Sequence, residues 1–440
     1  MQPSMRAFIT VWLGQMGSTI GSRMTHFAII LWAWSLTEQA TAIALIGFSA
    51  QVPRMIITPF AGVIVDSWNR KRLMMVGDTV AGVSAVIILV LHLNGSLALW
   101  HVYCTSAVNA AFSQIQQLAY TTSMTLMVPQ RHYPRAMSMN FLSGYGAGIF
   151  APALAGTLYT IVGLSGILVA DLITFAIAIC TVIAVTIPQP DAPVKPLSVS
   201  SIVQDVKIGF RYIGDRPGML GILLTAALFQ FVHEISNAIH SPMILARTDN
   251  DARAFALVSA TSGIGGVAGA LLITTWGGPN RRIHGVLLGM MGAGLSKIGF
   301  SLGQNPLVWV PMQFLSSLNF PLIGSSGNTI WLSKVSPELQ GRVFSVSLLI
   351  KGAVPPLGRF IAGPLADGVF EPAMMPTGRL APLLGGVFGT GAGAGMAVLY
   401  MLSAIAMLLT GLGGYLYRPL RIVEDTLPDH TSSHPQADSE

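Results

Sequence analysis

The feature that most constrains this sequence is a series of apolar segments, each about 20 residues long, that recur along nearly the whole chain. A bilayer core about 30 Å thick needs about this many apolar residues for each helical crossing, and short polar or basic breaks separate the segments. We therefore predict an all-α, polytopic membrane protein with twelve crossings, near residues 7–35, 41–65, 73–93, 97–118, 138–161, 163–187, 217–241, 254–276, 284–304, 306–333, 343–370 and 394–417.

Composition agrees with this prediction. Hydrophobic residues make up 52% of the 440 residues and charged residues only 10%, whereas an average soluble domain has about 25% charged residues. The apolar segments leave no room for a separate soluble domain. The first segment is too polar in its middle for a cleaved signal peptide, so we expect it to remain in the mature protein.

The positions of Lys and Arg predict the orientation, because positive charge is disfavoured in short loops on the outer side. Of the 24 basic residues, 16 fall on the side that holds both termini and the connection at 188–216, while Arg247, Arg253 and Arg379 lie opposite. We therefore expect a bacterial plasma membrane protein with both termini in the cytoplasm. Its partner is the lipid bilayer, and the positive net charge does not indicate nucleic acid binding.

The longest cytoplasmic break divides the predicted crossings into two groups of six. Residues 188–216 begin with Pro188, Pro190, Pro193 and Pro196 and continue into an amphipathic stretch, SIVQDVKIGFRYIGDRP, which predicts a helix along the membrane surface. We predict an N-terminal bundle at 1–187, a linker at 188–216, a C-terminal bundle at 217–420 and a disordered tail at 421–440.

A weak internal repeat indicates that the two bundles are pseudo-symmetric. Residues Pro134–Met139 align with Gly341–Val346 at an offset of 207 residues, and each segment precedes a helix rich in small residues. Faint symmetry of this kind is typical of transporters built from two similar halves.

The segment GVIVDSWNRKR, between the second and third crossings, contains Gly62, Asp66, Arg70, Lys71 and Arg72. It resembles the major facilitator superfamily motif, in which Gly, three apolar or small residues and Asp precede a basic cluster. Gly can allow two helices to approach closely, and the Asp can accept hydrogen bonds from a helix end or pair with Arg, forming a cytoplasmic gate. The alternative is an ordinary positive-inside loop that contains one Asp. Ser67 and Asn69 depart from the usual basic residue and Gly.

Several other segments resemble the macrolide-efflux and enterobactin-exporter-like branch of that superfamily, and together they span nearly the whole chain. They are WLGQMGSTIGSRMTHFAIILW, DVKIGFRYI, SPMILAR, ELQGRVFSV and GPLADGVFEP. The resemblance implies the major facilitator fold and export of a small solute.

In the fifth crossing, small residues surround a proline: Ala147, Ala151, Pro152, Ala155 and Gly156. The pattern is similar to the antiporter motif of exporters in this superfamily. Small residues permit tight backbone contact, and Pro152 removes an amide donor, so the segment can limit proton leakage. Ordinary helix packing is the alternative, because Ala replaces Gly three times.

Two otherwise apolar crossings carry polar residues on one face. Charged groups at mid-bilayer cost at least about 2.5–3.5 kcal/mol on insertion scales, so we expect these faces to handle solute. Under the superfamily fold they meet across a central cavity. The first crossing contributes Gln15, Thr19, Ser22, Arg23 and His26, and the seventh contributes Gln230, His233, Glu234, Asn237, His240 and Ser241.

Glu234 is the predicted proton-coupling residue, because a carboxylate in a poorly hydrated cavity favours its protonated form and releases the proton when water enters. His26 or His233 is its predicted relay. The alternative is a fixed ion pair between Glu234 and Arg23. Asp78 and Asp171 are interpreted as structural.

The fourth crossing adds Asn109, Ser113, Gln117 and Tyr120, which can bind a solute or a neighbouring helix. Arg54, Lys351 and Arg359 lie in gating crossings, where we favour ion pairs over attraction of an anionic solute.

The sequence does not predict an enzyme, a nucleotide-driven pump or a metal site. It contains no HExxH, paired-aspartate, Gly-x-Ser-x-Gly or P-loop motif, and Cys104 and Cys180 lack metal-ligand spacing, which indicates buried free thiols. We expect a monomer without cofactors that exports a small amphipathic or hydrophobic solute (drug, siderophore or secondary metabolite) by proton antiport with alternating access. A receptor evolved from a transporter, or an importer of lipid or solute, is the alternative.

Overall fold

The structure is a computed structural model that describes residues 5–187, 189 and 199–429, and helices are the only regular secondary structure in this part of the chain. The four prolines of the predicted linker and residues 430–440 of the predicted tail lie outside the described residues.

The first half of the chain folds into long helices joined by short turns. Gly163, with φ 63° and ψ −166°, interrupts α5, because a residue without Cβ adopts positive φ at little cost. This break falls between the predicted crossings 138–161 and 163–187. The helices are α1 (Met5–Thr37), α2 (Ala40–Ser67), α3 (Arg70–Leu93), α4 (Leu99–Met127), the short 3₁₀ helix η1 (Gln130–His132) and α5 (Tyr133–Ala184).

The second half begins with α6 (Val199–Gly214), which occupies the predicted amphipathic stretch and packs against α11. Five long helices follow, and short helices connect α11 to α14. They are α7 (Pro217–Arg247), α8 (Ala252–Trp276), α9 (Arg282–Leu302), α10 (Pro306–Lys334), α11 (Pro337–Leu365), the π-helical segment η2 (Ala366–Phe370), α12 (Glu371–Met374), α13 (Ala381–Phe388), α14 (Ala394–Leu416), α15 (Arg418–Arg421) and α16 (Val423–Thr426).

Each predicted crossing coincides with a helix or with one arm of α5. By length and composition, nine helical segments in the described part of the chain are able to span a membrane, and the segment that contains both arms of α5 is among them. Helices α1 and α4 are more polar than that criterion allows. Their polar residues face other helices and a central pocket, as shown below. The total of twelve crossings stays a prediction, because α1 and α4 do not meet the criterion.

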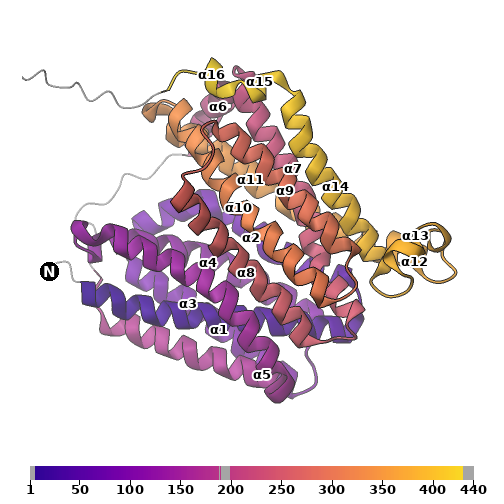
Figure 1. The fold of residues 1–440 in the computed structure, drawn as a ribbon. Coiled ribbons are helices and arrows are strands. Elements are labelled where there is room, and N and C mark those ends of the chain that lie inside the picture. Colours follow the sequence, from indigo (N-terminus) through magenta and orange to yellow (C-terminus); the bar gives the residue numbers. More distant parts are fainter. Residues whose placement is uncertain (1–4, 188, 190–198, 430–440) are drawn as a thin grey trace, which may run out of the picture.

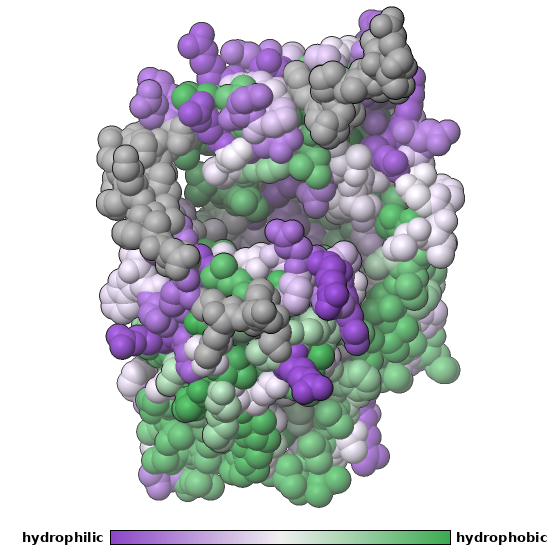
Figure 2. All heavy atoms as spheres, turned by 90° about the vertical axis from the view of Figure 1, so that its left-hand side faces the viewer, coloured by the Kyte–Doolittle hydropathy of each residue, from purple (hydrophilic) through white to green (hydrophobic). Residues whose placement is uncertain are grey.

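The two halves share a core at one end and separate at the other (Figure 1). At the shared end, which we call the closed end, the rings of Phe27 in α1 and Phe255 in α8 stack with centroids 4.5 Å apart. At the other end, the open end, each half has its own core, around Met74 in the first half and Met290 in the second. The α2–α3 turn lies at the open end, and Figure 2 shows a hollow between the halves there, with hydrophilic residues along its rim.

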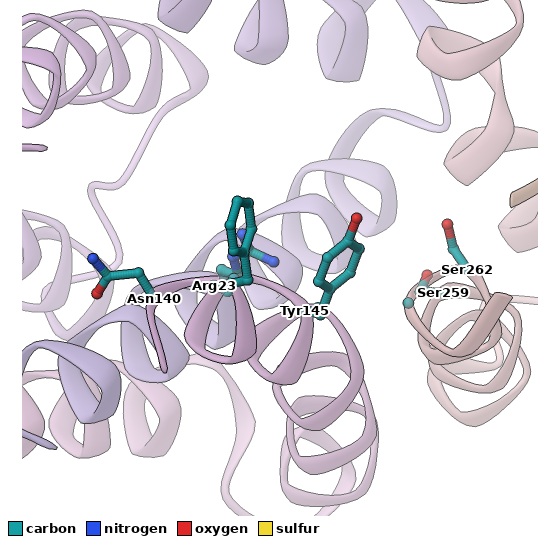
Figure 3. A pocket seen from close by; sticks show the side chains of 9 residues that line it. Arg23, Asn140, Tyr145, Ser259 and Ser262 are labelled. Carbon is teal, nitrogen blue, oxygen red and sulfur yellow. The ribbon is translucent and has the colours of Figure 1, made fainter. Parts of the chain in front are cut away.

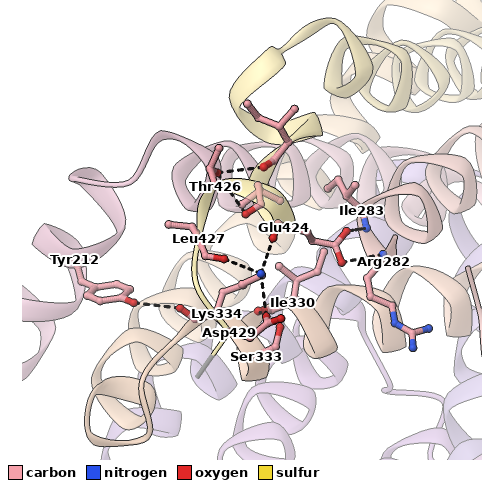
Figure 4. A network of polar contacts seen from close by, with 12 residues as sticks. Tyr212, Arg282, Ile283, Ile330, Ser333, Lys334, Glu424, Thr426, Leu427 and Asp429 are labelled. Atoms are coloured by element: carbon pink, nitrogen blue, oxygen red, sulfur yellow. Dashed lines mark hydrogen bonds and ion pairs between the residues drawn. The ribbon is translucent and has the colours of Figure 1, made fainter. Parts of the chain in front are cut away.

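Disorder from residue 421 onward was expected, and this prediction is wrong for residues 421–429. Helix α16 packs against the start of α9, where the Glu424 carboxylate accepts hydrogen bonds from the backbone N–H groups of Arg282 and Ile283 (Figure 4). The Lys334 ammonium donates to the carbonyls of Glu424 and Leu427. A helix N-terminus attracts carboxylate oxygens, which explains why this acidic segment is ordered.

Candidate functional site

A pocket of about 520 Å³ lies between the halves, lined by α1, α5 and α8. Arg23, Asn140, Tyr145, Ser259 and Ser262 provide its polar groups (Figure 3). Among the predicted solute-binding residues, Arg23 lines this pocket. Asn140, Tyr145 and the two serines were missed, because only the packing of α5 beside α8 brings them to the same space.

Glu234 is buried at the contact of α7 with α11 and α2. Its Oε2 lies 2.8 Å from Nε of Arg359, its Oε1 accepts a hydrogen bond from Gln230, and the Gln51 amide lies 3.5 Å from Oε2. The alternative considered for Glu234, a fixed ion pair with Arg23, is therefore wrong, because Arg359 of α11 occupies the position next to the carboxylate. Gln51 belongs to the first half, so this cluster bridges the two halves.

The predicted histidine relays are not hydrogen-bonded to Glu234. The ring of His233 stacks on Phe229 and lies 4.8 Å, centroid to centroid, from Phe320. His26 is exposed and lies near the positive charges of Arg23 and Arg359. Asn237 is exposed on α7. A proton relay through either histidine stays a prediction. It would require water between the histidine and Glu234, or movement of the side chains toward each other.

On the polar face of α1, two predicted solute-binding residues contact buried acids of neighbouring helices. Gln15 donates to Asp78 of α3, which also accepts from Gln116 of α4. Ser22, together with Thr25, donates to Asp171 of α5.

The remaining predicted residues of α1 and α4 make mostly local contacts. Thr19 donates to the Gln15 carbonyl, Ser113 donates to the Ala110 carbonyl, and Asn109 accepts from Ser84 of α3. Gln117 is exposed. Helix packing explains most of these polar side chains, and a solute-binding role for Gln117 stays a prediction.

The basic motif after α2 holds the open end of the first half together. Arg70 lies 3.8 Å from Asp66 and donates to the Thr122 carbonyl, and Lys71 donates to the carbonyls of Ile183 and Val185. Arg72 is exposed. The close helix approach expected at Gly62 is wrong for this conformation, since a Cβ placed there meets nothing within 4 Å. With the open end separated, α2 has no neighbour at that position.

Helix α5 lies against α8 across the two halves and is in close contact with it at Gly156. Ala147, Ala151 and Gly156 are buried, and a Cβ at Gly156 would lie 3.0 Å from the Ala252 carbonyl oxygen and closer still to Ala256. Pro152 lies within α5, whose break is instead at Gly163. The geometry provides the tight contact that the motif predicts.

A second contact between the halves closes the same end. Asp367, in η2, accepts hydrogen bonds from the backbone N–H groups of Ala40 and Thr41, at 3.0 and 2.7 Å. The carboxylate thus caps the N-terminus of α2 from the other half of the protein. The segment GPLADG contains this aspartate, yet its partner is not evident from sequence.

Lys297 of α9 forms a buried polar cluster that sequence reasoning did not assign. Its ammonium donates to Ser236 of α7 at 2.9 Å and to the Tyr400 hydroxyl of α14 at 3.2 Å. The ion pairs favoured for Arg54 and Lys351 are wrong, because in residues 5–187, 189 and 199–429 only Arg359 of the three pairs with a carboxylate.

The cysteines and the acids do not form a metal centre in the described ranges. Cys104 and Cys180 are free and exposed, not buried as predicted, because they lie on outward helix faces. No group of three or more His, Cys, Asp and Glu side chains among the described residues is placed to hold a metal ion.

Two helical halves around a polar pocket, closed at one end and open at the other, define a multi-pass membrane transporter. The chain belongs to the Major Facilitator Superfamily, whose family model matches residues 11–359. Macrolide efflux protein A from Streptococcus pyogenes is 23% identical over 364 residues, which cover 82% of this chain and 90% of that protein. Multidrug efflux pump Tap from Mycolicibacterium fortuitum is 24% identical over 364 residues, covering 77% and 85%.

Solved structures agree on the fold. A mutant of the nucleoside transporter NupG superposes with a TM-score of 0.73 at 11% identity, covering 92% of this chain and 98% of that one. A bacterial homologue of the iron transporter ferroportin, in an inward-facing state, gives 0.68 at 14% identity, covering 93% and 98%.

Proposed function

We propose that this protein is a secondary active exporter that moves small amphipathic solutes out of the cell in exchange for protons. Its efflux relatives support the direction, and the absence of a P-loop motif from the sequence supports a gradient as the energy source. Transport, and not catalysis, is the activity assigned to the pocket. With both termini in the cytoplasm, the open end faces the cytoplasm and admits solute from inside.

The observation that carries the proton-coupling proposal is the position of Glu234. Its carboxylate is buried, pairs with Arg359 and lies beside Gln51 of the opposite half. Protonation removes the charge that holds Arg359, and the contact between α7, α11 and α2 weakens. Protonation from the outer side therefore belongs to the conformation in which this end is open, and release of the proton to the cytoplasm restores the Arg359 pair and the contact seen here, as antiport by alternating access requires.

The gating residues support the same cycle. A Cβ at Gly62 has open space around it, and Asp66 and Arg72 are exposed at the open end. When this end closes, the second half can therefore contact these residues. The α5–α8 contact at Gly156 and the Asp367 contact with α2 are broken when the closed end opens.

The test is transport in vesicles reconstituted with the monomeric protein. Vesicles that contain wild type, Glu234→Gln or a control variant are loaded with a panel of amphipathic dyes and drugs. The control is Glu38→Gln, because Glu38 is an exposed acid in the α1–α2 loop. An imposed pH gradient should accelerate movement in wild type and in the control, and should have no effect in Glu234→Gln.

Gradient-driven movement in Glu234→Gln at the same rate as in wild type would show that Glu234 is not the proton-coupling residue. Movement in the inward direction would support an importer, and no movement of any compound would favour a receptor.

A further inference from the structure

The pocket between the halves contains a cation that has no protein partner. Arg23 is exposed in the pocket, and among the described residues its side chain forms neither an ion pair nor a hydrogen bond. Helices α2 and α11, which do not line this pocket, carry two further basic residues, Arg54 and Lys351, and no carboxylate among the described residues pairs with either. Arg54 precedes Met55 and Lys351 precedes Gly352 in the sequence. The two helices meet at these neighbours, since Met55 lies 3.9 Å from a Cβ placed at Gly352.

The acids of the same region already have partners. Glu234 is bound by Arg359 and Gln230, Asp171 by Ser22 and Thr25, and Asp78 by Gln15 and Gln116. Of these acids only Glu234 has a cationic partner, yet the basic residues placed within the crossings outnumber the three acids, since they are Arg23, Arg54, Lys297, Lys351 and Arg359. An ionised group inside a membrane protein is costly unless a counter-charge or a function compensates for it, and a bound anion would supply the counter-charge for Arg23.

The walls of the pocket suit the acidic end of an amphipathic molecule. A Cβ at Gly148 would lie 3.2 Å from Nη1 of Arg23, so the glycine leaves room beside the guanidinium. The hydroxyls of Tyr145 and Ser262 point into the same space from α5 and α8 (Figure 3), and Phe141 provides an apolar surface. A guanidinium presents paired donors that match a carboxylate, sulfonate or phosphate.

We propose that the Arg23 pocket binds the anionic group of an amphipathic solute, so that the transported substrates are organic acids with an apolar body. This inference rests on the proposed function for its physiological meaning, but binding tests it independently. A cationic amphiphile of the same shape would meet the positive charge of Arg23 and be rejected.

The experiment uses three dansyl probes that differ only at the end of a six-carbon chain. The chain ends in a carboxylate, a methyl group or an ammonium group. Binding to the purified full-length protein is followed by dansyl fluorescence for wild type, Arg23→Gln, Arg23→Glu and the control Arg253→Gln. Arg253 is exposed at the start of α8 and does not line the pocket.

Wild type and the control should bind the carboxylate probe about tenfold more tightly than the methyl probe, as expected for a charge-assisted pair of hydrogen bonds. Arg23→Gln should lose this tenfold preference while its affinity for the methyl probe is unchanged, which also shows that the variant is folded. Arg23→Glu should prefer the ammonium probe.

Equal affinity of wild type for all three probes, or an equal loss of all three in Arg23→Gln, would overturn the proposal. Vesicle transport separates it from the proposed function. Charge-selective binding without gradient-driven transport contradicts only the exporter, and gradient-driven transport without charge selectivity contradicts only the anion subsite.

Discussion

Glu234 and Arg359, 125 residues apart in sequence, form an ion pair 2.8 Å long inside the second half of the protein. Their helices, α7 and α11, also touch through Gly358, where a Cβ would lie 3.0 Å from that of Glu234. Arg359 reaches past this contact to Gly47 of α2, so a single guanidinium links the carboxylate to the other half.

Removal of one partner of this ion pair should lower the free energy of unfolding more than removal of both partners. Arg359→Met leaves a buried carboxylate without its cation and should lower the free energy of unfolding by about 3–5 kcal/mol. Adding Glu234→Gln to Arg359→Met should restore most of that loss, because a neutral amide needs no counter-charge. Chemical denaturation in detergent measures the difference.

Arg54→Met is the matched control, since Arg54 is exposed and has no carboxylate partner within the described ranges. It should change the unfolding free energy by less than about 0.5 kcal/mol. A double variant as unstable as Arg359→Met would contradict the coupling between the two residues.

Much of the fold was predictable because a membrane imposes a length and a polarity on each helix. The break at Gly163 and the helix that begins at Pro217 follow from local sequence alone. The motif that contains Asp66 and Arg70 offered two roles for the aspartate, and the structure contains one of them, the pair with Arg70.

The partners of mid-helix polar residues were not predictable, because they depend on how distant helices rotate against each other. Periodicity placed Gln15 and Ser22 on one face of α1, but not the acids Asp78 and Asp171 opposite them. For the same reason the alternative considered for Glu234 was a pair with Arg23 and not with Arg359, and the capping role of Glu424 was missed.

Loss of the Asp367 carboxylate should loosen the closed end. Asp367→Ala removes the cap from the N-terminus of α2, a contribution of about 1 kcal/mol, so the open population at this end should rise about fivefold. The measurement is the rate of maleimide labelling at Thr41→Cys, after Cys104 and Cys180 are replaced by Ser.

Asp249→Ala is the control, because Asp249 is exposed in the α7–α8 turn and no hydrogen bond or ion pair joins it to η2 among the described residues. Identical labelling rates with and without Asp367 would show that its hydrogen bonds do not hold the halves together.

A methyl group at Gly156 should push α5 away from α8. Its Cβ would meet Ala256 and the Ala252 carbonyl oxygen at distances that require backbone movement, so Gly156→Ala should disfavour the conformation seen here. Alternating access then predicts closure of the open end. Spin labels at Ser67→Cys and Thr275→Cys, on the exposed open ends of α2 and α8, should report a shorter distance.

Gly324→Ala, in α10, is the matched control, because a Cβ there has no neighbour within 4 Å and no gating role is proposed for this residue. An unchanged distance distribution in Gly156→Ala would show that the α5–α8 contact does not select the conformation.

The segment after α14 should stabilise the second half through Glu424. Its carboxylate caps α9 and its main chain accepts a hydrogen bond from Lys334, an ammonium that is buried and also lies 2.9 Å from Asp429. Glu424→Ala should therefore lower the unfolding free energy by about 0.5–2 kcal/mol, and Glu424→Gln, which keeps one acceptor oxygen, should lose less.

Truncation sharpens this last prediction, because it separates the capping segment from the residues beyond it. Removal of residues 423–440 deprives the buried Lys334 ammonium of all three of its oxygen partners and should cost more than Glu424→Ala. Removal of 430–440 alone leaves those contacts in place and should be close to neutral. Thermal unfolding of wild type, Glu424→Ala and the two truncated proteins in the same detergent gives the order. Equal stability of the long truncation and wild type would mean that Lys334 finds other partners and that α16 adds nothing to the fold.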